Sequence, residues 1–357
     1  MKIKVAISGV GNCASALVQG VEYYKNAEEN SQVPGLMHLT FGGYHLRDID
    51  FVAAFDVNRL KIGRDLSEAI FAEPNCCVRF ANMPDLGVKV LPGPILDGVA
   101  AHMKIPFNVY SEDEDPANVA DVLKESKADM LLNFLPVGSF RGTRHYAQAC
   151  LDTGCAFVNC IPEFIASEPE WVRKFEDADL PVAGDDVKSQ IGATIVHRAL
   201  IDLLVSRGIR IERTYQLNVG GNTDFLNMTT ESRVKTKRES KISALTSLAP
   251  YKIEAWAGPN GHIPFLKDNK ICHVYIQGRK FGNVPIDMDL KLSVQDSPNS
   301  AGVVIDVVRA TKLALDRGIK GQLTSISAYA FKHPPVQMPD HVARQRVEEF
   351  IQGNRER

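Results

Sequence analysis

The chain has 357 residues, of which 45% are hydrophobic and 24% charged, and its formal net charge is −2. This length and composition favour a globular protein of about two domains, and a charge so close to zero gives no support for a nucleic-acid or membrane partner. The sequence shows no apolar run that could cross a bilayer, no signal peptide and no Cys-x-x-Cys pair among its seven cysteines. We therefore expect a cytoplasmic protein with reduced thiols and no thiolate zinc site.

A short apolar strand near the N-terminus leads into a turn with the pattern Gly-x-Gly-x-x-Ala, and an amphipathic helix follows it. Gly9 permits the tight turn, Gly11 lets a pyrophosphate approach the backbone, and Ala14 allows close packing of helix and strand. The order of strand, turn and helix predicts a dinucleotide site, with Asn12 and Cys13 among the cofactor-binding residues. The alternative is a glycine turn that arose by chance.

The acidic residue that accompanies this fingerprint normally ends the second strand, about twenty residues later. Here residues 23–48 carry prolines and glycines and are interpreted as an inserted loop. The buried strand expected at residues 49–55 then ends at Asp56. A carboxylate there would accept hydrogen bonds from ribose hydroxyls and repel a 2′-phosphate, which favours NAD over NADP. An ordinary loop aspartate is the alternative.

Residues 71–108 are rich in Pro, Gly and Asn and predict a long covering loop. Beyond them, helices expected at residues 116–126 and 143–153 alternate with strands that end at Asn133 and Asn159. This alternation predicts an α/β fold with a doubly wound, Rossmann-type parallel sheet. Both asparagines would lie at the edge where a nicotinamide binds, although each could also be a simple turn residue.

Residues 184–189, Gly-Asp-Asp-Val-Lys-Ser, join a buried strand to a helix expected at residues 189–205. They bring two carboxylates, an ammonium and a hydroxyl, those of Asp185, Asp186, Lys188 and Ser189, to the carboxyl end of a strand, where ligands bind in open α/β sheets. They also lie at a helix start, whose unpaired N–H groups attract anions. Because Gly-Asp-Asp is common turn chemistry, an exposed turn is the alternative.

The second half of the chain changes pattern. Alternating segments predict strands of a second, mixed or antiparallel sheet at residues 210–219, 271–278 and 287–294. A helix is then expected at residues 301–317, a strand at residues 325–331, and a charged helix from Asp340 that faces solvent or another subunit.

This order predicts a split domain. Residues 1–196 and 296–357 would form the Rossmann domain, because the helix after Asp296 is expected to return to the first sheet. Residues 197–295 would form an α+β domain for catalysis and oligomerisation.

Several separated motifs carry a resemblance to a known family. Besides the glycine turn and residues 184–189 they are Asn218 to Asp224, Lys237-x-x-x-Lys241, Asp268-Asn269-Lys270, Asp296-Ser297 and Lys332. Over nearly its whole length the chain resembles the myo-inositol-1-phosphate synthase (inositol-3-phosphate synthase) family in its short bacterial and archaeal form. It departs from longer members at the first turn, which reads Gly-x-Gly-Gly-Asn-Asn-Gly in them, and at Thr223, where they have Asn.

The resemblance implies redox-neutral conversion of D-glucose 6-phosphate to 1D-myo-inositol 3-phosphate, for inositol and inositol-phospholipid biosynthesis. NAD takes a hydride from C5, the 5-keto sugar loses a C6 proton, C6 attacks the C1 aldehyde, and the hydride is returned. A dehydrogenase with net redox turnover and a non-catalytic NAD sensor are the alternatives from other classes.

The resemblance also implies roles for individual residues. Lys332 and Lys237 are assigned proton transfer at O5 and C6, and Lys270 and Lys241 the stabilisation of O1 and phosphate. Asp268 orients these lysines. The cofactor and substrate sets are completed by Asp185 and Asp296 beside the nicotinamide, and by Ser189, Asn218, Asn222 and Asp224 on phosphate and hydroxyls. Without the resemblance, the basic run around Lys237 would be interpreted as a solvated helix face.

The family further implies a homotetramer held by the second sheet. Some family members use a divalent metal ion near the nicotinamide and phosphate; carboxylates that could hold one are available here, and the sequence does not decide whether a metal ion is bound.

Overall fold

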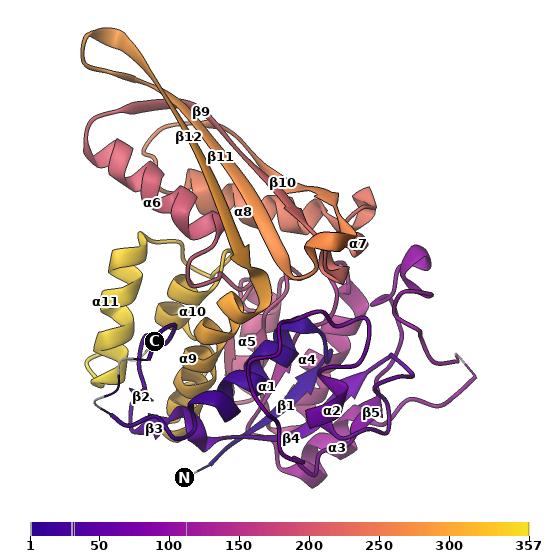
Figure 1. The fold of residues 1–357 in the computed structure, drawn as a ribbon. Helices are drawn as coiled ribbons and strands as arrows, with labels where there is room; N and C mark the ends of the chain where they lie inside the picture. The colour runs from indigo at the N-terminus through magenta and orange to yellow at the C-terminus, as the bar shows by residue number, and fades with distance from the viewer. Residues whose placement is uncertain (1, 30, 32, 112, 356) are drawn as a thin grey trace.

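The computed structural model describes residues 2–29, 31, 33–111, 113–355 and 357, and its fold is α/β (Figure 1). It contains a large parallel sheet of seven strands and a small mixed sheet of four. In Figure 1 the small sheet, in orange, extends upward from the large sheet and its helices. Among the described residues, no helix has the length and apolar character needed to cross a membrane.

The large sheet has the Rossmann-type arrangement predicted from the alternating elements. Its strands, in spatial order, are β13 (Gly321–Gln322), β8 (Pro181–Ala183), β7 (Ala156–Asn159), β6 (Met130–Asn133), β1 (Ile3–Ser8), β4 (Ile49–Asp56) and β5 (Val90–Pro92). Every neighbouring pair is parallel. The order reverses between β1 and β6, so the carboxyl ends of these two strands define the crevice where such sheets bind ligands.

Both faces of the large sheet are covered by helices. Side chains that alternate along β1 separate into two cores: Val5 and Ile7 pack with α1 (Asn12–Tyr24) and α9 (Asp296–Asp316), whereas Ala6 faces the opposite core. That second core contains side chains of α3 (Val119–Ser126), α4 (Phe140–Thr153) and α5 (Pro169–Asp177). Burial on both faces explains why the strands read as nearly continuous apolar runs.

The small sheet has the order β10-β9-β11-β12. Its strands are β9 (Arg210–Gly220), β10 (Glu254–His262), β11 (Asn269–Lys280) and β12 (Val284–Gln295). The β9–β10 pair is parallel and the other two pairs are antiparallel, so the sheet is mixed. One face packs on α6 (Ala193–Ser206) and α8 (Lys235–Thr246), and the other carries the stacked rings of Tyr215 and Tyr275.

Short elements complete the chain. They are α2 (Leu66–Ala69), α7 (Thr223–Asn227), the hairpin of β2 (Thr40–Phe41) with β3 (Tyr44–His45), and the 3₁₀ helices η1 (Leu46–Asp48), η2 (Ala101–Met103), η3 (Glu231–Arg233), η4 (Pro264–Leu266) and η5 (Phe281–Asn283). The small hairpin lies within the inserted loop predicted at residues 23–48. Strand β5 and helix η2 are the short elements of the covering loop.

The end of the chain returns to the large sheet. Helix α9 packs in the same core as α1, and β13 adds the outermost strand beside β8. The strand predicted at residues 325–331 is wrong, because this segment is the helix α10 (Thr324–Ala330). A seven-residue run that alternates small and apolar side chains fits either period, and packing of Ile326 and Ala330 into the core decides for the helix.

Helix α11 (Asp340–Ile351) begins where the sequence predicts, but it is not simply a solvated surface. Ala343, Val347 and Phe350 are buried at helical spacing. One side of α11 therefore belongs to the interior of this chain.

The helix predicted from residue 189 begins four residues later, at Ala193. Residues 189–192 instead form a turn held by Asn299, whose backbone carbonyl accepts from the Gln190 N–H and whose side chain accepts from the Ile191 N–H.

Candidate active site

The glycine turn lies at the carboxyl end of β1, on one wall of a large pocket between the two sheets. Gly9 has φ +89°, and a Cβ there would lie 2.6 Å from the Phe134 carbonyl oxygen, so only glycine fits. A Cβ at Gly11 would meet nothing within 4 Å, which leaves open space beside the start of α1. The first turn of α1 has no acidic side chain, so its N–H groups can favour an anion.

Asp56 lines the same pocket, but its carboxylate already has protein partners. It accepts hydrogen bonds from the backbone N–H groups of Val10, Val57 and Asn58 at 2.8–2.9 Å. The buried ammonium of Lys61 lies 3.5 Å away. These contacts fix Asp56 against the glycine turn, where the sequence predicts the ribose partner.

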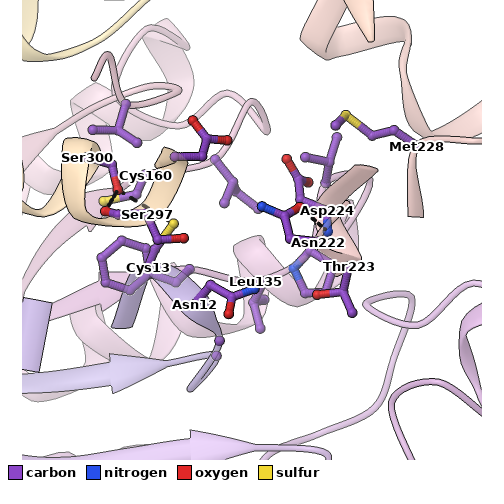
Figure 2. A pocket seen from close by; sticks show the side chains of 18 of the residues that line it. Asn12, Cys13, Leu135, Cys160, Asn222, Thr223, Asp224, Met228, Ser297 and Ser300 are labelled. Carbon is purple, nitrogen blue, oxygen red and sulfur yellow. Dashed lines mark hydrogen bonds between the residues drawn. The ribbon is translucent and has the colours of Figure 1, made fainter. Parts of the chain in front are cut away.

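Asn12 joins the glycine turn to the covering loop. Its side-chain oxygen accepts hydrogen bonds from the N–H groups of Cys76 and Cys77, at 2.6 and 2.9 Å. Figure 2 shows Asn12 and Cys13 on one side of the pocket, near Ser297 and Ser300, with Asn222, Thr223 and Asp224 on the other. The pocket wall thus combines the large sheet with α7 and the start of α9.

Asp186 is the centre of the lysine cluster. Its fully buried carboxylate lies 2.8 Å from the Lys332 ammonium and 3.3 Å from that of Lys237, and it accepts a 2.5 Å hydrogen bond from Ser240. Burial alone would raise the pKa of Asp186, but the two ammonium groups outweigh it and lower that pKa. Asp186 is therefore an anion that holds one lysine from α8 and one from the segment after α10 at the pocket.

The four predicted lysines all line the pocket but differ in the direction in which their surroundings shift the pKa. Burial, together with the neighbouring ammonium groups of Lys270, Lys237 and Lys332, lowers the pKa of Lys241 to about 7. Burial also lowers the pKa of Lys332, more than Asp186 raises it. For Lys237, nearby carboxylates outweigh burial and raise the pKa.

Lys270 has its own carboxylate partner. Its ammonium donates a 2.8 Å hydrogen bond to Asp296, which also lines the pocket. Burial opposes both charges, but their attraction wins: the pKa of Lys270 is raised and that of Asp296 is lowered. This pair is charged at neutral pH and links β11 to the start of α9.

Asp268 lies just behind that wall. It accepts hydrogen bonds from the Asn222 amide and from the backbone and hydroxyl of Ser297. Burial raises its pKa to about 6. Asp268 does not line the pocket itself; it holds Asn222 and Ser297, which do.

Three predicted cofactor residues lie behind the pocket wall. Asn133 donates to the Asn159 side chain at 2.9 Å, and Asn159 donates to Asp185 at 2.7 Å. Asp185 also accepts from backbone N–H groups at residues 165–167, and all three side chains are fully buried. The network organises the loop that follows β7 but forms no part of the pocket surface.

The remaining substrate residues divide in the same way. Ser189, Asn222 and Asp224 line the pocket, whereas Asn218 lies behind it. Residues outside the predicted set also belong to the site, among them Asp186, which holds two lysines, and Gln216, which forms part of the wall. Asp186 has the sequence signal that singled out residues 184–189, and Gln216 precedes Asn218 by two on the same strand.

Across the described residues, no group of three or more His, Cys, Asp or Glu side chains is arranged to hold a metal ion. Asp186 is paired with Lys237 and Lys332, and Asp296 with Lys270, so these carboxylates are occupied by ammonium groups. This donor set does not fit a divalent ion.

Comparison with known proteins gives a consistent family. A model described as myo-inositol-1-phosphate synthase matches residues 192–297. The chain is 53% identical to inositol-3-phosphate synthase of Mycolicibacterium smegmatis, over 99% of this chain and 98% of that protein. It is 52% identical to inositol-3-phosphate synthase of Corynebacterium glutamicum, over 98% of both.

A solved structure agrees with these relatives. A myo-inositol-1-phosphate synthase-related protein from Thermotoga maritima has a TM-score of 0.79 and 25% identity, with 99% of each chain covered. Full-length identity above one half, together with this shared fold, makes the chain an enzyme of the inositol-3-phosphate synthase family.

Proposed function

We propose that this enzyme converts D-glucose 6-phosphate to 1D-myo-inositol 3-phosphate with NAD that is regenerated in each cycle. The observation that carries the proposal is the convergence of four lysines on the pocket that contains the Gly9 turn. A simple dehydrogenase needs one acid–base group, whereas a cyclisation has to handle a phosphate, an enolate and an aldol alkoxide. Several cations in one enclosed site suit the second reaction.

The residues of the glycine turn fit a dinucleotide. The space at Gly11 and the start of α1 would hold the pyrophosphate, and Asp56 would face the adenosine ribose. When bound, NAD supplies a hydride acceptor for C5 at the start of the cycle and a hydride donor at its end. Because the residues do not fit a metal ion, no step is assigned to one.

The protein's own part in the reaction is proton transfer and charge stabilisation. At the 5-keto stage a base has to remove the C6 proton, and Lys241, whose pKa burial lowers to about 7, suits this role at neutral pH. Lys237 was predicted for proton transfer, but its raised pKa favours a fixed positive charge. We therefore propose to assign the C6 proton to Lys241 and electrostatic stabilisation to Lys237.

Lys332 and Lys270 complete the charge arrangement. The lowered pKa of Lys332 supports its predicted role in exchanging a proton with O5. Lys270, fixed by Asp296, would stabilise O1 as C6 attacks C1. Ring closure also gains from confinement, since well-aligned intramolecular reactions save about 7–11 kcal/mol of barrier.

The domain division predicted from the sequence supports this proposal. Residues 1–196 with 296–357 would bind the cofactor, and residues 197–295 would contribute most lysines. The predicted boundary at residue 196 falls inside α6, so that helix would be shared by the two domains.

The test is incubation of purified protein with glucose 6-phosphate and NAD. We expect inositol phosphate by chromatography and no net gain of NADH absorbance. Lys332→Ala should retain NAD binding and lose at least about a hundredfold in turnover, whereas Lys320→Ala, in an exposed ion pair with Asp179, should keep full activity. Stoichiometric NADH would instead indicate a net-redox dehydrogenase, and binding without any product would indicate an NAD sensor.

A further inference from the structure

A chain of buried polar side chains connects the small sheet to the pocket. Thr214 donates to the Tyr275 carbonyl at 2.6 Å and lies 2.7 Å from Nε2 of His197. Nδ1 of His197 lies 3.4 Å from Oε1 of Gln216. The chain continues as Gln216 donates to the Asn218 oxygen at 3.2 Å, and Asn218 donates to the Gly258 carbonyl at 2.9 Å.

This series of hydrogen-bonded side chains has one proton too few to supply a donor to every contact. Both ends are backbone carbonyls, which only accept, and five contacts separate them. The four side chains between them are a hydroxyl, a neutral imidazole and two amides, and each supplies one proton along the chain. Reversing the amides or the imidazole tautomer moves the gap but cannot close it, so one contact always joins two acceptors.

The gap falls at Gln216. The 3.4 Å contact of His197 with Gln216 is the longest of the five, while the Thr214 contacts fix Nε2 of His197 as a donor and leave Nδ1 with a lone pair. Burial lowers the pKa of His197 to about 4, more than its contact with Gln216 raises it, so the imidazole does not supply the missing proton at neutral pH. The side-chain carbonyl of Gln216 is thus left without a hydrogen-bond donor within this network.

Gln216 is also where the network meets the pocket wall. All four side chains are at most 3% exposed, and Gln216 is the one of the four that lines the pocket. We propose that Gln216 is a specificity residue whose side-chain carbonyl accepts a hydrogen bond from a hydroxyl of the sugar phosphate. The inference rests on the proposed function and adds to it a residue that recognises one substrate hydroxyl.

The network allows a test that leaves every pocket-lining residue intact. Thr214→Val removes the contact with the Tyr275 carbonyl and frees Nε2 of His197 from donating. The contacts from His197 to Gln216, from Gln216 to Asn218 and from Asn218 to the Gly258 carbonyl then remain, with three protons to fill them. Nδ1 of His197 can therefore donate to the Gln216 carbonyl, which no longer needs a donor from the substrate. Thr214→Ser keeps the hydroxyl, so the network still lacks one proton. This variant serves as the matched control.

Binding is measured by calorimetry on protein saturated with NADH, which cannot oxidise the sugar. One neutral hydrogen bond corresponds to about three- to tenfold in affinity. We expect Thr214→Val to bind glucose 6-phosphate about three- to tenfold more weakly than wild type, with NADH affinity unchanged, and Thr214→Ser to match wild type. Equal affinity of the valine and serine variants would overturn the proposal.

Substrate analogues identify the hydroxyl. Among glucose 6-phosphates that lack the oxygen at C2, C3 or C4, one should lose affinity for wild type and show no further loss with Gln216→Leu. Additive losses for every analogue, or a Gln216→Leu variant that loses NADH affinity instead, contradict the assignment. Wild-type protein that does not bind glucose 6-phosphate contradicts the proposed function itself, whereas normal binding without coupling to Gln216 contradicts only this inference.

Discussion

At the scale of single residues, the four lysines of the pocket outnumber the carboxylates that form ion pairs with them. Lys237 and Lys332 share Asp186, and Lys270 has Asp296, but Lys241 has no carboxylate among the ion pairs of the described residues. Burial and three neighbouring ammonium groups therefore bring its pKa to about 7. A lysine in this state can accept a proton without a preceding change in the protein.

The first prediction concerns the pH dependence of turnover. If Lys241 accepts the C6 proton as a neutral amine, turnover should rise as the pH increases through about 7, where the group loses its proton. Lys241→Arg retains the charge but cannot become neutral, so it should lose at least about a hundredfold at every pH. Initial rates between pH 5.5 and about 9 measure both; a wild-type profile that is flat across neutrality argues against this base.

The second prediction concerns Asp186. Asp186→Asn leaves two buried ammonium groups without their shared carboxylate and should cost about 3 kcal/mol in the free energy of unfolding at pH 7. Because the folded-state pKa of Asp186 lies below the ordinary 3.8, its contribution is complete above that pH and is lost as the pH falls further. The difference from wild type should therefore narrow below about pH 4.

Urea unfolding at several pH values measures this difference. Asp179→Asn is the control, since its ion pair with Lys320 is largely exposed and should contribute less than about 1 kcal/mol. A stability difference for Asp186→Asn that does not change with pH would show that the carboxylate acts through shape rather than charge.

Sequence reasoning identified the residue types of the site but not which of two neighbours reaches it. Asp185 and Asp186 are adjacent and chemically alike. In the structure Asp185 turns into the buried amide network, and Asp186, at φ 63°, meets the lysines. Gln216 and Asn218 lie on the same face of β9, but of the two it is Gln216 that lines the pocket. Such choices depend on tertiary packing, which periodicity does not encode.

At the scale of elements, α11 is fixed to the rest of the molecule by a buried charge network. Asp340, at its first position, accepts hydrogen bonds from Lys188 at 2.9 Å and from Arg198 at 2.7 Å. Those cations are only 2% and 1% exposed, and Arg198 also donates to the carbonyls of Ala244 and Met338. One aspartate thus joins the C-terminal helix to α6 and, through Arg198, to α8.

The third prediction is that Asp340→Ala weakens this connection. Two buried cations lose their carboxylate, which should cost about 3 kcal/mol in the free energy of unfolding, at the low end for broken buried pairs because Asp340 is 31% exposed. Urea unfolding at pH 7 measures it, with the exposed Asp179→Ala as control. Equal midpoints for the two variants would mean that solvent already compensates Lys188 and Arg198.

Periodicity predicted many of the elements but missed two elements of nine residues each, β10 and α5. The alternating segments became β9, β11 and β12, because hydrophobic period alone separates long strands from helices. Helix α10 was predicted as a strand, since its seven residues fit both periods. The buried side of α11 was missed because Ala343, Val347 and Phe350 form a narrow stripe among charged residues.

At the scale of the whole molecule, the outer face of the small sheet remains to be explained. Tyr215 and Trp256 are 37% and 38% exposed there, and Tyr215 stacks on Tyr275 from the adjacent strand. Exposed aromatic side chains of this kind are typical of protein interfaces. We therefore expect this face to be a subunit contact in the predicted homotetramer.

The fourth prediction follows from that face. Light scattering of the wild type at micromolar concentration should give the mass of a tetramer, and Trp256→Arg should give a smaller species. Lys320 directly precedes β13 of the large sheet, away from this face. Lys320→Ala should therefore leave the mass of the assembly unchanged. A wild-type monomer would exclude the tetramer and leave the exposed rings without a partner.

The return of the chain to the large sheet has a consequence for biosynthesis. Helix α9 fills the core beside α1, and β13 completes the sheet only at residues 321–322. A ribosome that has made the first six strands of this sheet has therefore not yet made the helix that covers their inner face. From the end of β8 at Ala183 to the end of α9 at Asp316 the ribosome still has to add about 130 residues, at about 5–20 residues per second, while this face of the strands is only partly covered. This enzyme is thus expected to fold after release and to bind chaperones during its own translation.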